Sequence, residues 1–365
     1  MSIDYLELIN RINNCSRLYI YGAGIIGYGV YVAIEKMFYT KTEKFIVSDK
    51  HNNPNKYAEV DVIDIYDYSN IMKSDDLIVI ATPPEYHCDI EDTLSQIKYV
   101  NYVLITPSLE YKLMGAYLKQ IKGITCIEDL IYTTDTIPSD AKVYMAVSHK
   151  DKELKNKYVE EEYVNIIQVG KARTGIVNKN AIVFDDDGEN ISHYNDLYGE
   201  LTATYCAWKN FTHDVTGIFH YRRTLDVKIE QFAIFNDYDV ILPLPFVCYP
   251  DASGQYGRYL CNEDIEVMKD VIFKFYPELK TKIIEALNSP YLYNYNILIA
   301  RKEVFNDYCE WIFPLLEEIT NRCEMVQRKR FPRYIGRIGE ILTSLYFTLN
   351  IKDWKITHAP KIWRV

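Results

Sequence analysis

Residues 17–27 read RLYIYGAGIIG, an apolar segment that runs directly into the glycines Gly22, Gly24 and Gly27. The apolar residues predict a strand over 17–21, and the periodic apolar residues that follow predict a helix over 25–38. A strand, a glycine-rich turn and a helix in this order are typical of the first unit of a parallel, doubly wound sheet. The predicted fold class is therefore α/β.

Strand and helix patterns continue to alternate after this unit, as a parallel sheet requires. The further segments expected in the first half are strands at 44–48, 76–81 and 101–105 and helices at 87–97 and 108–121. The polar stretch 133–140 contains a proline and indicates a linker, after which a new strand begins at 142. We expect two domains: a Rossmann-like parallel sheet in residues 1–137 and a second α/β domain in residues 138–365.

The glycine loop has two interpretations, and both stay open at this point. It is suited to nucleotide binding at a helix N-terminus, with Asp49 at the end of the next strand holding a ribose. Alternatively, Gly22, Gly24 and Gly27 only permit a tight turn and close packing of helix on strand.

Composition excludes several classes of function. The 365 residues carry a formal net charge of −10, which argues against nucleic acid as a partner. The eight cysteines form no CxxC pair, and this is typical of reduced thiols rather than of disulfides or zinc ligands. The N-terminus does not read as a signal peptide, and no apolar run approaches about 20 residues. We expect a cytoplasmic protein.

In the second half, the predicted strands are 142–148, 216–221, 239–243 and 295–300, and the predicted helices are 195–210, 262–275, 302–319 and 336–349. Polar residues gather where these elements begin and end. They are His149 and Lys150 after the first strand, Gln168 and Gly170 in the segment IQVG, Asn190 in the turn DDDGEN, and Asn195 as an expected helix N-cap. Asp185 and Asp187 are spaced to hold Mn²⁺ or Mg²⁺, although an Asp/Gly turn is the preferred interpretation of this composition.

The segment HYRR (220–223) ends a predicted strand. In an extended chain His220 and Arg222 point to one side, and Tyr221 and Arg223 to the other. One arginine then reaches a diphosphate while the other supports the fold. A solvated strand end with a structural salt bridge is the alternative.

Three further groups are candidates for a site. Asn294 and Asn296 begin a strand, and Glu340 near the start of the last helix is either a general base or a helix N-terminal charge. The region 322–337 is rich in basic residues and includes Arg337. It is suited to a donor phosphate or to a lipid-linked acceptor at a membrane surface, and otherwise it is a solvated loop.

The motifs together resemble a known bacterial family. SHK, IQVG, DDDGENIS, NxxYxELTAxYxAWKN, GxxHYRR, NxLIAR and RxGxxGExL follow one another over residues 142–350. In this order they are similar to a polysaccharide-biosynthesis family catalogued as a domain of unknown function and grouped with GT-A glycosyltransferases. The first domain more weakly resembles the Rossmann-like modules that accompany sugar-modifying enzymes of capsule and lipopolysaccharide gene clusters.

The resemblance implies a GT-A-like sheet that binds a nucleotide diphosphate sugar, with a UDP-sugar as the expected donor. It implies transfer of a hexosyl unit (galactofuranosyl, galactosyl or glucosyl) to a glycan or lipid-linked acceptor at the inner face of the membrane. HYRR occupies the place of the metal-binding DxD of GT-A enzymes, which puts metal dependence in doubt and assigns Arg222 and Arg223 to the leaving diphosphate.

By the same resemblance, His149, Lys150 and Gln168 flank the nucleotide, and Asn190 and Asn195 lie beside the donor. The strand that begins at Asn294 contacts the sugar, and Glu340 is the base if the reaction inverts. Two other classes of function stay open. One is an NAD(P)-dependent sugar oxidoreductase or epimerase, and the other is a non-catalytic sugar-binding protein of a polysaccharide assembly complex.

Overall fold

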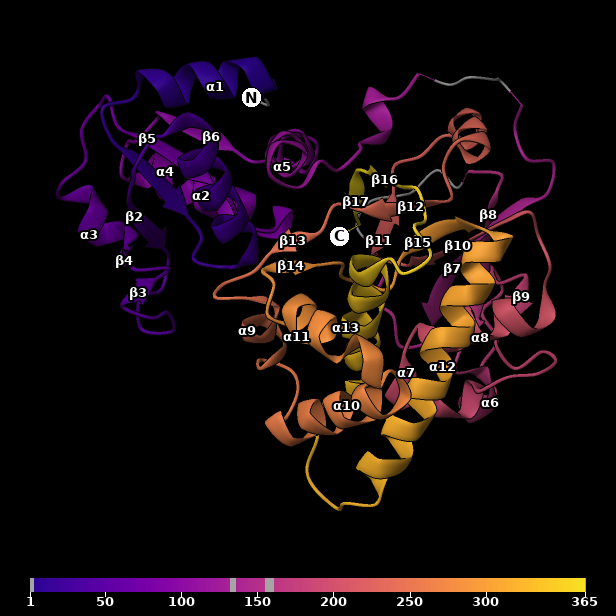
Figure 1. Cartoon of the computed structure of the whole chain (residues 1–365). Coiled ribbons are helices and arrows are strands. Elements are labelled where there is room, and N and C mark those ends of the chain that lie inside the picture. The colour runs from indigo at the N-terminus through magenta and orange to yellow at the C-terminus, as the bar shows by residue number, and fades with distance from the viewer. Residues whose placement is uncertain (1–2, 132–135, 155–160, 365) are drawn as a thin grey trace. The chain divides into compact units, whose positions relative to one another are not determined.

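The computed structural model of the chain describes residues 3–131, 136–154 and 161–364. The chain divides into two units, which Figure 1 shows with their helices and strands. Unit 1 comprises Met1–Ile124 and Phe246–Pro250, and unit 2 comprises Thr125–Pro245 and Asp251–Val365. The sheet of unit 1 is mainly parallel, and that of unit 2 combines parallel and antiparallel strands between helices, so the predicted α/β fold class is confirmed.

In its described residues, unit 1 contains a sheet with the strand order β3-β4-β2-β1-β5-β6. Every neighbouring pair is parallel except β3 and β4 at one edge. The strands of this sheet are β1 (Leu18–Tyr21), β2 (Thr42–Val47), β3 (Lys56–Tyr57), β4 (Val60–Asp64), β5 (Leu77–Ile80) and β6 (Tyr102–Leu104). Unit 1 also includes β13 (Phe246–Val247) from later in the chain, which is not part of this sheet. The helices are α1 (Tyr5–Asn14), α2 (Ile25–Phe38), α3 (Ile65–Ser69), η1 (Pro84–Tyr86), α4 (His87–Gln96) and α5 (Pro107–Lys122).

The division between the units falls after Ile124, whereas the sequence placed it near residue 138. The reason is a backbone contact. The Thr125 carbonyl accepts a hydrogen bond from the His358 amide at 2.9 Å, and Cys126 forms an isolated parallel bridge with His358. The segment after Ile124 therefore belongs with the C-terminal strands. Of the linker expected at 133–140, residues 133–135 lie outside the described residues.

The glycine loop of unit 1 contains two different kinds of glycine. A Cβ on Gly22, whose φ is +119°, would lie 2.7 Å from the Ala81 carbonyl oxygen, and one on Gly27 would lie 1.8 Å from that of Gly22. A Cβ on Gly24 would meet no atom within 4 Å. Close packing therefore accounts for Gly22 and Gly27, while the space beside Gly24 is open.

Asp49, the expected ribose partner, is exposed and holds its own loop. Its carboxylate accepts hydrogen bonds from the His51 amide at 2.9 Å and from Asn52 Nδ2 at 2.5 Å. A ribose contact by Asp49 would have to compete with these local bonds.

In its described residues, unit 2 is built on a larger sheet with the main strand order β16-β12-β15-β10-β7-β8-β9, to which β11 and β17 are joined beside β10. Strand β15 runs antiparallel to both β10 and β12. The strands are β7 (Ala141–Ser148), β8 (Val164–Val169), β9 (Val183–Phe184), β10 (Val215–His220), β11 (Arg223–Leu225), β12 (Val240–Pro243), β15 (Leu298–Arg301), β16 (Ile356–Ala359) and β17 (Lys361–Trp363). The short strand β14 spans Tyr291–Leu292.

The helices of unit 2 range from single turns to the long α12, which carries a wide apolar stripe. They are η2 (Ile127–Asp129), α6 (Lys171–Thr174), η3 (Ser192–Tyr194), α7 (Asn195–Tyr198), α8 (Leu201–Asn210), η4 (Ile229–Asn236), α9 (Ala252–Tyr256), α10 (Asn262–Phe275), η5 (Pro277–Leu279), α11 (Lys280–Leu287), α12 (Lys302–Glu324) and α13 (Tyr334–Leu349). In the part of the chain that the structure describes, none of the helices has the length and apolarity to cross a bilayer.

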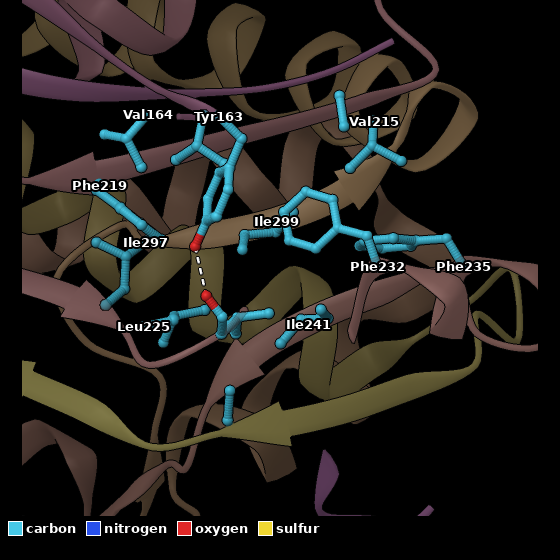
Figure 2. Packing of buried hydrophobic residues seen from close by; sticks show 14 of the residues in the cluster. Tyr163, Val164, Val215, Phe219, Leu225, Phe232, Phe235, Ile241, Ile297 and Ile299 are labelled. Atoms are coloured by element: carbon cyan, nitrogen blue, oxygen red, sulfur yellow. Dashed lines mark hydrogen bonds between the residues drawn. The ribbon is translucent and has the colours of Figure 1, made fainter. Parts of the chain in front are cut away.

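Side chains that alternate along the strands bury both faces of the unit 2 sheet, as period-2 strands predict. On one face, Val215 and Phe219 of β10 and Ile299 of β15 pack with Phe232 and Phe235 of η4, as Figure 2 shows. The hydroxyl of Tyr163 donates to the Val227 carbonyl at 2.5 Å within this cluster. Helices α8 and α12 cover the opposite face.

Asp185, which directly follows β9, is fully buried and hydrogen-bonded on both oxygens. One oxygen accepts from the Gly170 amide at 2.8 Å and from Thr202 Oγ1 at 2.6 Å, and the other accepts from Ser192 Oγ at 2.5 Å. These donors come from the end of β8, from α8 and from η3. A buried carboxylate needs such donors, because burial without them is very costly.

We predict that Gly27→Ala destabilises unit 1 by about 2 kcal/mol or more, because the new methyl group meets a backbone carbonyl that cannot move aside cheaply. Amide hydrogen exchange of β1 and α2 in the full chain measures this loss as reduced protection. Gly24→Ala is the matched control and should change protection by no more than about 0.5 kcal/mol. Equal effects of the two substitutions would contradict the packing account of the loop.

A second prediction concerns the buried carboxylate. Asp185→Ala should lower the free energy of unfolding by about 3 kcal/mol or more, because several buried donors lose their acceptor. Urea unfolding followed by tryptophan fluorescence reports on unit 2, where all four tryptophans lie. Asp187→Ala, at an exposed position two residues away, should stay within about 0.5 kcal/mol of the wild type. A mild effect at Asp185 would show that its hydrogen bonds do not hold this edge together.

Candidate functional site

The polar residues of unit 2 converge at one edge of its sheet. Strands β7, β8 and β10 are parallel, so their carboxyl ends share an edge. Because β15 runs the opposite way, its amino end lies at this edge too. The edge therefore brings together four groups of residues: His149–Asp151, Gly170, His220–Arg223 and Asn296. In α/β proteins this is where ligands bind.

The HYRR segment forms a tight hairpin and is not extended, so the expected alternation of its side chains is wrong. Strand β10 ends at His220, Tyr221 and Arg222 make the turn, and β11 begins at Arg223, which pairs with His220. The Arg222 carbonyl accepts a hydrogen bond from the Arg364 amide at 3.0 Å, and this anchors the turn to the residue after β17.

The hairpin gives its two arginines different environments. The Arg223 guanidinium stacks on Trp363 at 3.7 Å from the ring centroid and lies 5.4 Å from that of Tyr295. The Arg222 side chain is exposed, and no carboxylate among the described residues pairs with it. Arg222 is thus available to an anionic ligand, while Arg223 holds the hairpin against β17.

His220 is neutral at physiological pH. Burial lowers its pKa to about 3, and the positive charges of Arg222, Arg223 and Arg333 add to the shift. Its Nδ1 accepts a hydrogen bond from the Arg222 amide at 3.2 Å, which leaves the proton on Nε2. His220 can therefore donate a hydrogen bond to a ligand, but it is too weakly basic to be a general base.

A cavity of ≈520 Å³ opens beside the ends of β7 and β10. His149, Asp151, Tyr221 and Arg364 are among the residues that line it. His149 Nδ1 is buried and has no hydrogen-bond partner among the described residues. Burial raises the pKa of Asp151 to about 6, against the opposing charges of Arg333 and Arg222. The cavity is within the size range of small-molecule sites and offers polar groups.

Asn296 organises the other side of the edge. It is 1% exposed and adopts a φ of +52°. Its Nδ2 donates to Glu200 Oε1 at 2.9 Å and to the Gly336 carbonyl at 3.2 Å, and its Oδ1 accepts from Thr343 Oγ1 at 2.9 Å. Asn296 therefore fixes the start of α8 to α13. Asn294 makes a local contact, since its Oδ1 accepts the Tyr295 amide at 3.0 Å.

Glu340 lies in the same region as Glu200. Burial raises the pKa of Glu340 to about 8, the negative charge of Glu200 raises it further, and Arg337 opposes the shift. Burial also raises the pKa of Glu200. The Arg337 guanidinium lies over the Tyr259 ring at 4.0 Å from its centroid. A carboxyl that titrates near neutral pH is suited to proton transfer.

Several expected ligand-binding residues hold the loops instead. Gln168 is fully buried and accepts the Asn178 amide at 2.6 Å, and Asn190 donates to the Gly188 carbonyl at 2.8 Å. Asn195 is not an N-cap: its Nδ2 donates to the Gly199 carbonyl at 2.8 Å, and its side chain packs on Gly170. Lys150 is exposed and pairs with Asp196 at 3.3 Å.

The Asp185/Asp187 pair does not present a ready cation site. The Asp185 oxygens are occupied by protein donors, and Asp187 is exposed. Within residues 3–131, 136–154 and 161–364, no three His, Cys, Asp or Glu side chains gather in a way that would hold a metal ion.

The basic region 322–337 does not act as one patch. Arg322 pairs with Glu318 at 2.8 Å, and Arg330 pairs with the buried Asp264 at 3.0 Å. Arg328 lies 3.1 Å from Glu263. Arg333 differs, because no carboxylate among the described residues pairs with it and its charge acts on Asp151, His220 and Glu200. Only part of the region therefore faces the site.

Sequence reasoning missed Asp151, Tyr221, Arg333 and Arg364 as members of this site. Asp151 directly follows the Ser-His-Lys motif and Tyr221 lies inside HYRR, so their positions next to a motif could have predicted both as site residues. Arg333 was noticed only as one of many basic residues. Arg364 follows a strand that the sequence pattern did not reveal, and no local signal marks it.

Comparison with known proteins gives a family and one informative structure. No curated protein matches the sequence. The structure titled WbbM bifunctional glycosyltransferase in its apo form is 24% identical, with a TM-score of 0.51 over 62% of this chain and 45% of that chain. This chain thus spans less than half the length of that protein, and the likeness shows a shared fold.

A structure titled RSP in complex with β-NADH covers 32% of this chain and 69% of its own, at 17% identity and a TM-score of 0.22, which supports no inference. The family model for the domain of unknown function DUF4422 matches residues 142–351, and the motif order over 142–350 had indicated a family of this kind. Because the match spans more than half of the sequence, this protein belongs to the DUF4422 family.

Proposed function

We propose that unit 2 is a glycosyltransferase that moves a hexosyl unit from a nucleotide diphosphate sugar to a glycan acceptor in bacterial cell-surface polysaccharide synthesis. The observation that carries the proposal is that two arginine side chains at the strand-end edge have no carboxylate partner among the described residues. Arg222 and Arg333 act on the same residues at the strand-end edge, and no carboxylate among the described residues pairs with either. Unpaired guanidinium groups in a protein of net charge −10 favour an anionic ligand.

The chemistry of glycosyl transfer requires such groups. When the bond between the sugar and the diphosphate breaks, negative charge develops on the leaving oxygen and must be stabilised. Arg222 is exposed at the hairpin turn, and His220, two residues before it, offers its Nε2–H as a neutral donor. Arg223 contributes indirectly, since its stacking on Trp363 positions the turn.

The cavity lined by His149, Asp151, Tyr221 and Arg364 is the proposed place of the nucleotide. Its volume of ≈520 Å³ suits a ligand of this size, and it adjoins the hairpin that would hold the diphosphate. Stabilisation of the leaving diphosphate by a divalent cation is a separate proposal. Asp185 does not fit as its ligand, so we assign no step to a metal.

Glu340 is the proposed general base of an inverting reaction. It would take the proton of the acceptor hydroxyl as that oxygen attacks the sugar, and a pKa near 8 suits this role at neutral to mildly basic pH. The charge of Arg337 acts on Glu340, and Asn296, whose amide is engaged by Glu200, Gly336 and Thr343, would position this side of the site without contacting the sugar.

The alternative of an NAD(P)-dependent sugar enzyme draws on the glycine loop of unit 1. The open space at Gly24 would admit a diphosphate at the start of α2, whereas Asp49 is engaged in its own loop. This alternative does not explain why Arg222 and Arg333 of unit 2 lack carboxylate partners among the described residues, so the transferase is the preferred function. A sugar-binding protein without catalysis is the other alternative, and hydrolysis of a nucleotide sugar in the absence of acceptor would exclude it.

Arg222→Ala is expected to lower kcat by a factor of about 10² to 10³, because it removes one preorganised donor to the leaving group. The effect should persist in EDTA. Steady-state transfer or donor hydrolysis measures it, and Arg322→Ala, which breaks only an i,i+4 surface pair, should retain activity. A wild type inactivated by chelator, together with a fully active Arg222→Ala variant, would exclude the arginine role.

The pH dependence of kcat/KM tests the base. Because Glu340 must be deprotonated to accept a proton, kcat/KM should rise with pH and level off above about 8. Glu340→Gln should abolish this rise of kcat/KM with pH and lower kcat/KM by a factor of about 10² to 10⁴. If the glutamine variant keeps both the rate and the pH profile of the wild type, Glu340 is not the base.

A further inference from the structure

A second pocket, of ≈340 Å³, lies between α8 and α12 of unit 2. Its aromatic wall comes from Tyr194 of η3, Tyr198 of α7, Tyr205 and Trp208 of α8, and Phe313 of α12. The strand-end site uses none of these residues. The pocket therefore needs an explanation of its own.

The aromatic wall is rigid, and three of its rings, from α8 and α12, contact one another. Trp208 and Phe313 stack with their planes 7° apart and their centroids 5.6 Å apart. Tyr205 stands perpendicular to both, at 88° and 89°. Its hydroxyl is fixed by a hydrogen bond to Glu189 Oε1 at 2.9 Å, and Tyr198 is fixed by Thr320 Oγ1 at the same distance. Such a wall offers apolar ring surface at little cost in conformational entropy.

Polar groups that are not used by the protein line the same pocket. Glu317 and Asn321 lie one turn apart on α12, and both side chains are exposed. Within the described residues, neither makes a side-chain hydrogen bond or an ion pair. A carboxylate and a carboxamide at this spacing can together accept from and donate to neighbouring hydroxyl groups.

This combination matches one class of ligand. A pyranose ring presents C–H groups on its faces and hydroxyl groups on its rim, so it packs on aromatic rings while its hydroxyls bond to acid and amide side chains. Lys209 also lines the pocket, but its Nζ pairs with Glu189 at 3.5 Å and lies 3.7 Å from the Trp208 ring centroid. The charge without a protein partner is therefore that of Glu317, which disfavours sugars that carry carboxylates or phosphates. We propose that this pocket binds a neutral hexose residue of the acceptor glycan, at a distance from the reacting sugar.

The chain connects the pocket to the strand-end edge. Within the segment 194–198, Tyr194 and Tyr198 line the pocket, while Asn195 packs on Gly170 and Asp196 pairs with Lys150 at the edge. A glycan several units long could therefore reach both places. The assignment of the occupant as an acceptor rests on the proposed function, whereas sugar binding itself does not.

Saturation-transfer NMR with the full chain tests the site directly, without donor present. The probes are neutral glucose and galactose hexasaccharides and a hexasaccharide of galacturonic acid as the charged comparison. We expect saturation transfer to ring protons of a neutral probe and weaker binding of the acidic one. The double variant Glu317→Gln, Asn321→Ala should weaken binding about tenfold or more. Glu310→Ala, an exposed residue of α12 that lines a different pocket, should not.

Both substituted positions are exposed, so circular dichroism should show a folded double variant with an unchanged melting temperature. Failure of both neutral probes to bind, or binding by the double variant at wild-type strength, overturns the site. Nucleotide affinity separates this proposal from the previous one. Saccharide binding without any nucleotide binding would support the pocket and refute the transferase, and the reverse result would do the opposite.

Discussion

The burial of the Asp185 carboxylate is the constraint on which the strand-end edge depends. A carboxylate removed from water must be met by donors, and here they come from the end of β8, from η3 and from α8. Gly170 can supply its amide because it adopts a φ of +72° and has no side chain to collide with Asn195. One acidic residue thus sets the relative positions of three segments at this edge.

The same arrangement explains where charge remains available. The Asp185 carboxylate is satisfied by two hydroxyl groups and a backbone amide and needs no cation as a partner. Arg222 and Arg333 have no carboxylate partner among the described residues, and burial together with the charges of Arg222, Arg223 and Arg333 holds His220 neutral. On the other side, Asn296 positions Glu200, whose negative charge adds to the effect of burial on Glu340. Anion-binding and proton-accepting groups therefore lie at one sheet edge.

The sequence predicted the regular elements well where periodicity was strong. The helices expected at 25–38 and 262–275 have those bounds in the structure. The helix expected at 195–210 is instead two helices, because Gly199 takes a φ of +59° and interrupts it. The conformation of HYRR was mispredicted because β11 pairs with β17, whose residues are more than a hundred positions away. Pairing at that distance leaves no local pattern.

The residues of the candidate site were predictable only in part. Motifs next to strand ends located His149 and His220, since the end of a strand can be read from local pattern. Which side chain is free and which is structural depends on contacts between distant segments. Arg223 stacks on Trp363 and Arg330 pairs with Asp264, whereas Arg333 has no carboxylate partner among the described residues. These assignments require the three-dimensional fold.

The central claim is that unit 2 binds a nucleotide diphosphate sugar at its strand ends. Thermal unfolding with a panel of nucleoside diphosphates, nucleotide sugars and NADH, each with EDTA or with Mn²⁺, tests it most directly, because a ligand that binds the folded state raises Tm. The account predicts that one nucleoside diphosphate and its sugar raise Tm in EDTA, with little response to NADH. Stabilisation by NADH alone, or by no nucleotide sugar under either condition, would contradict it.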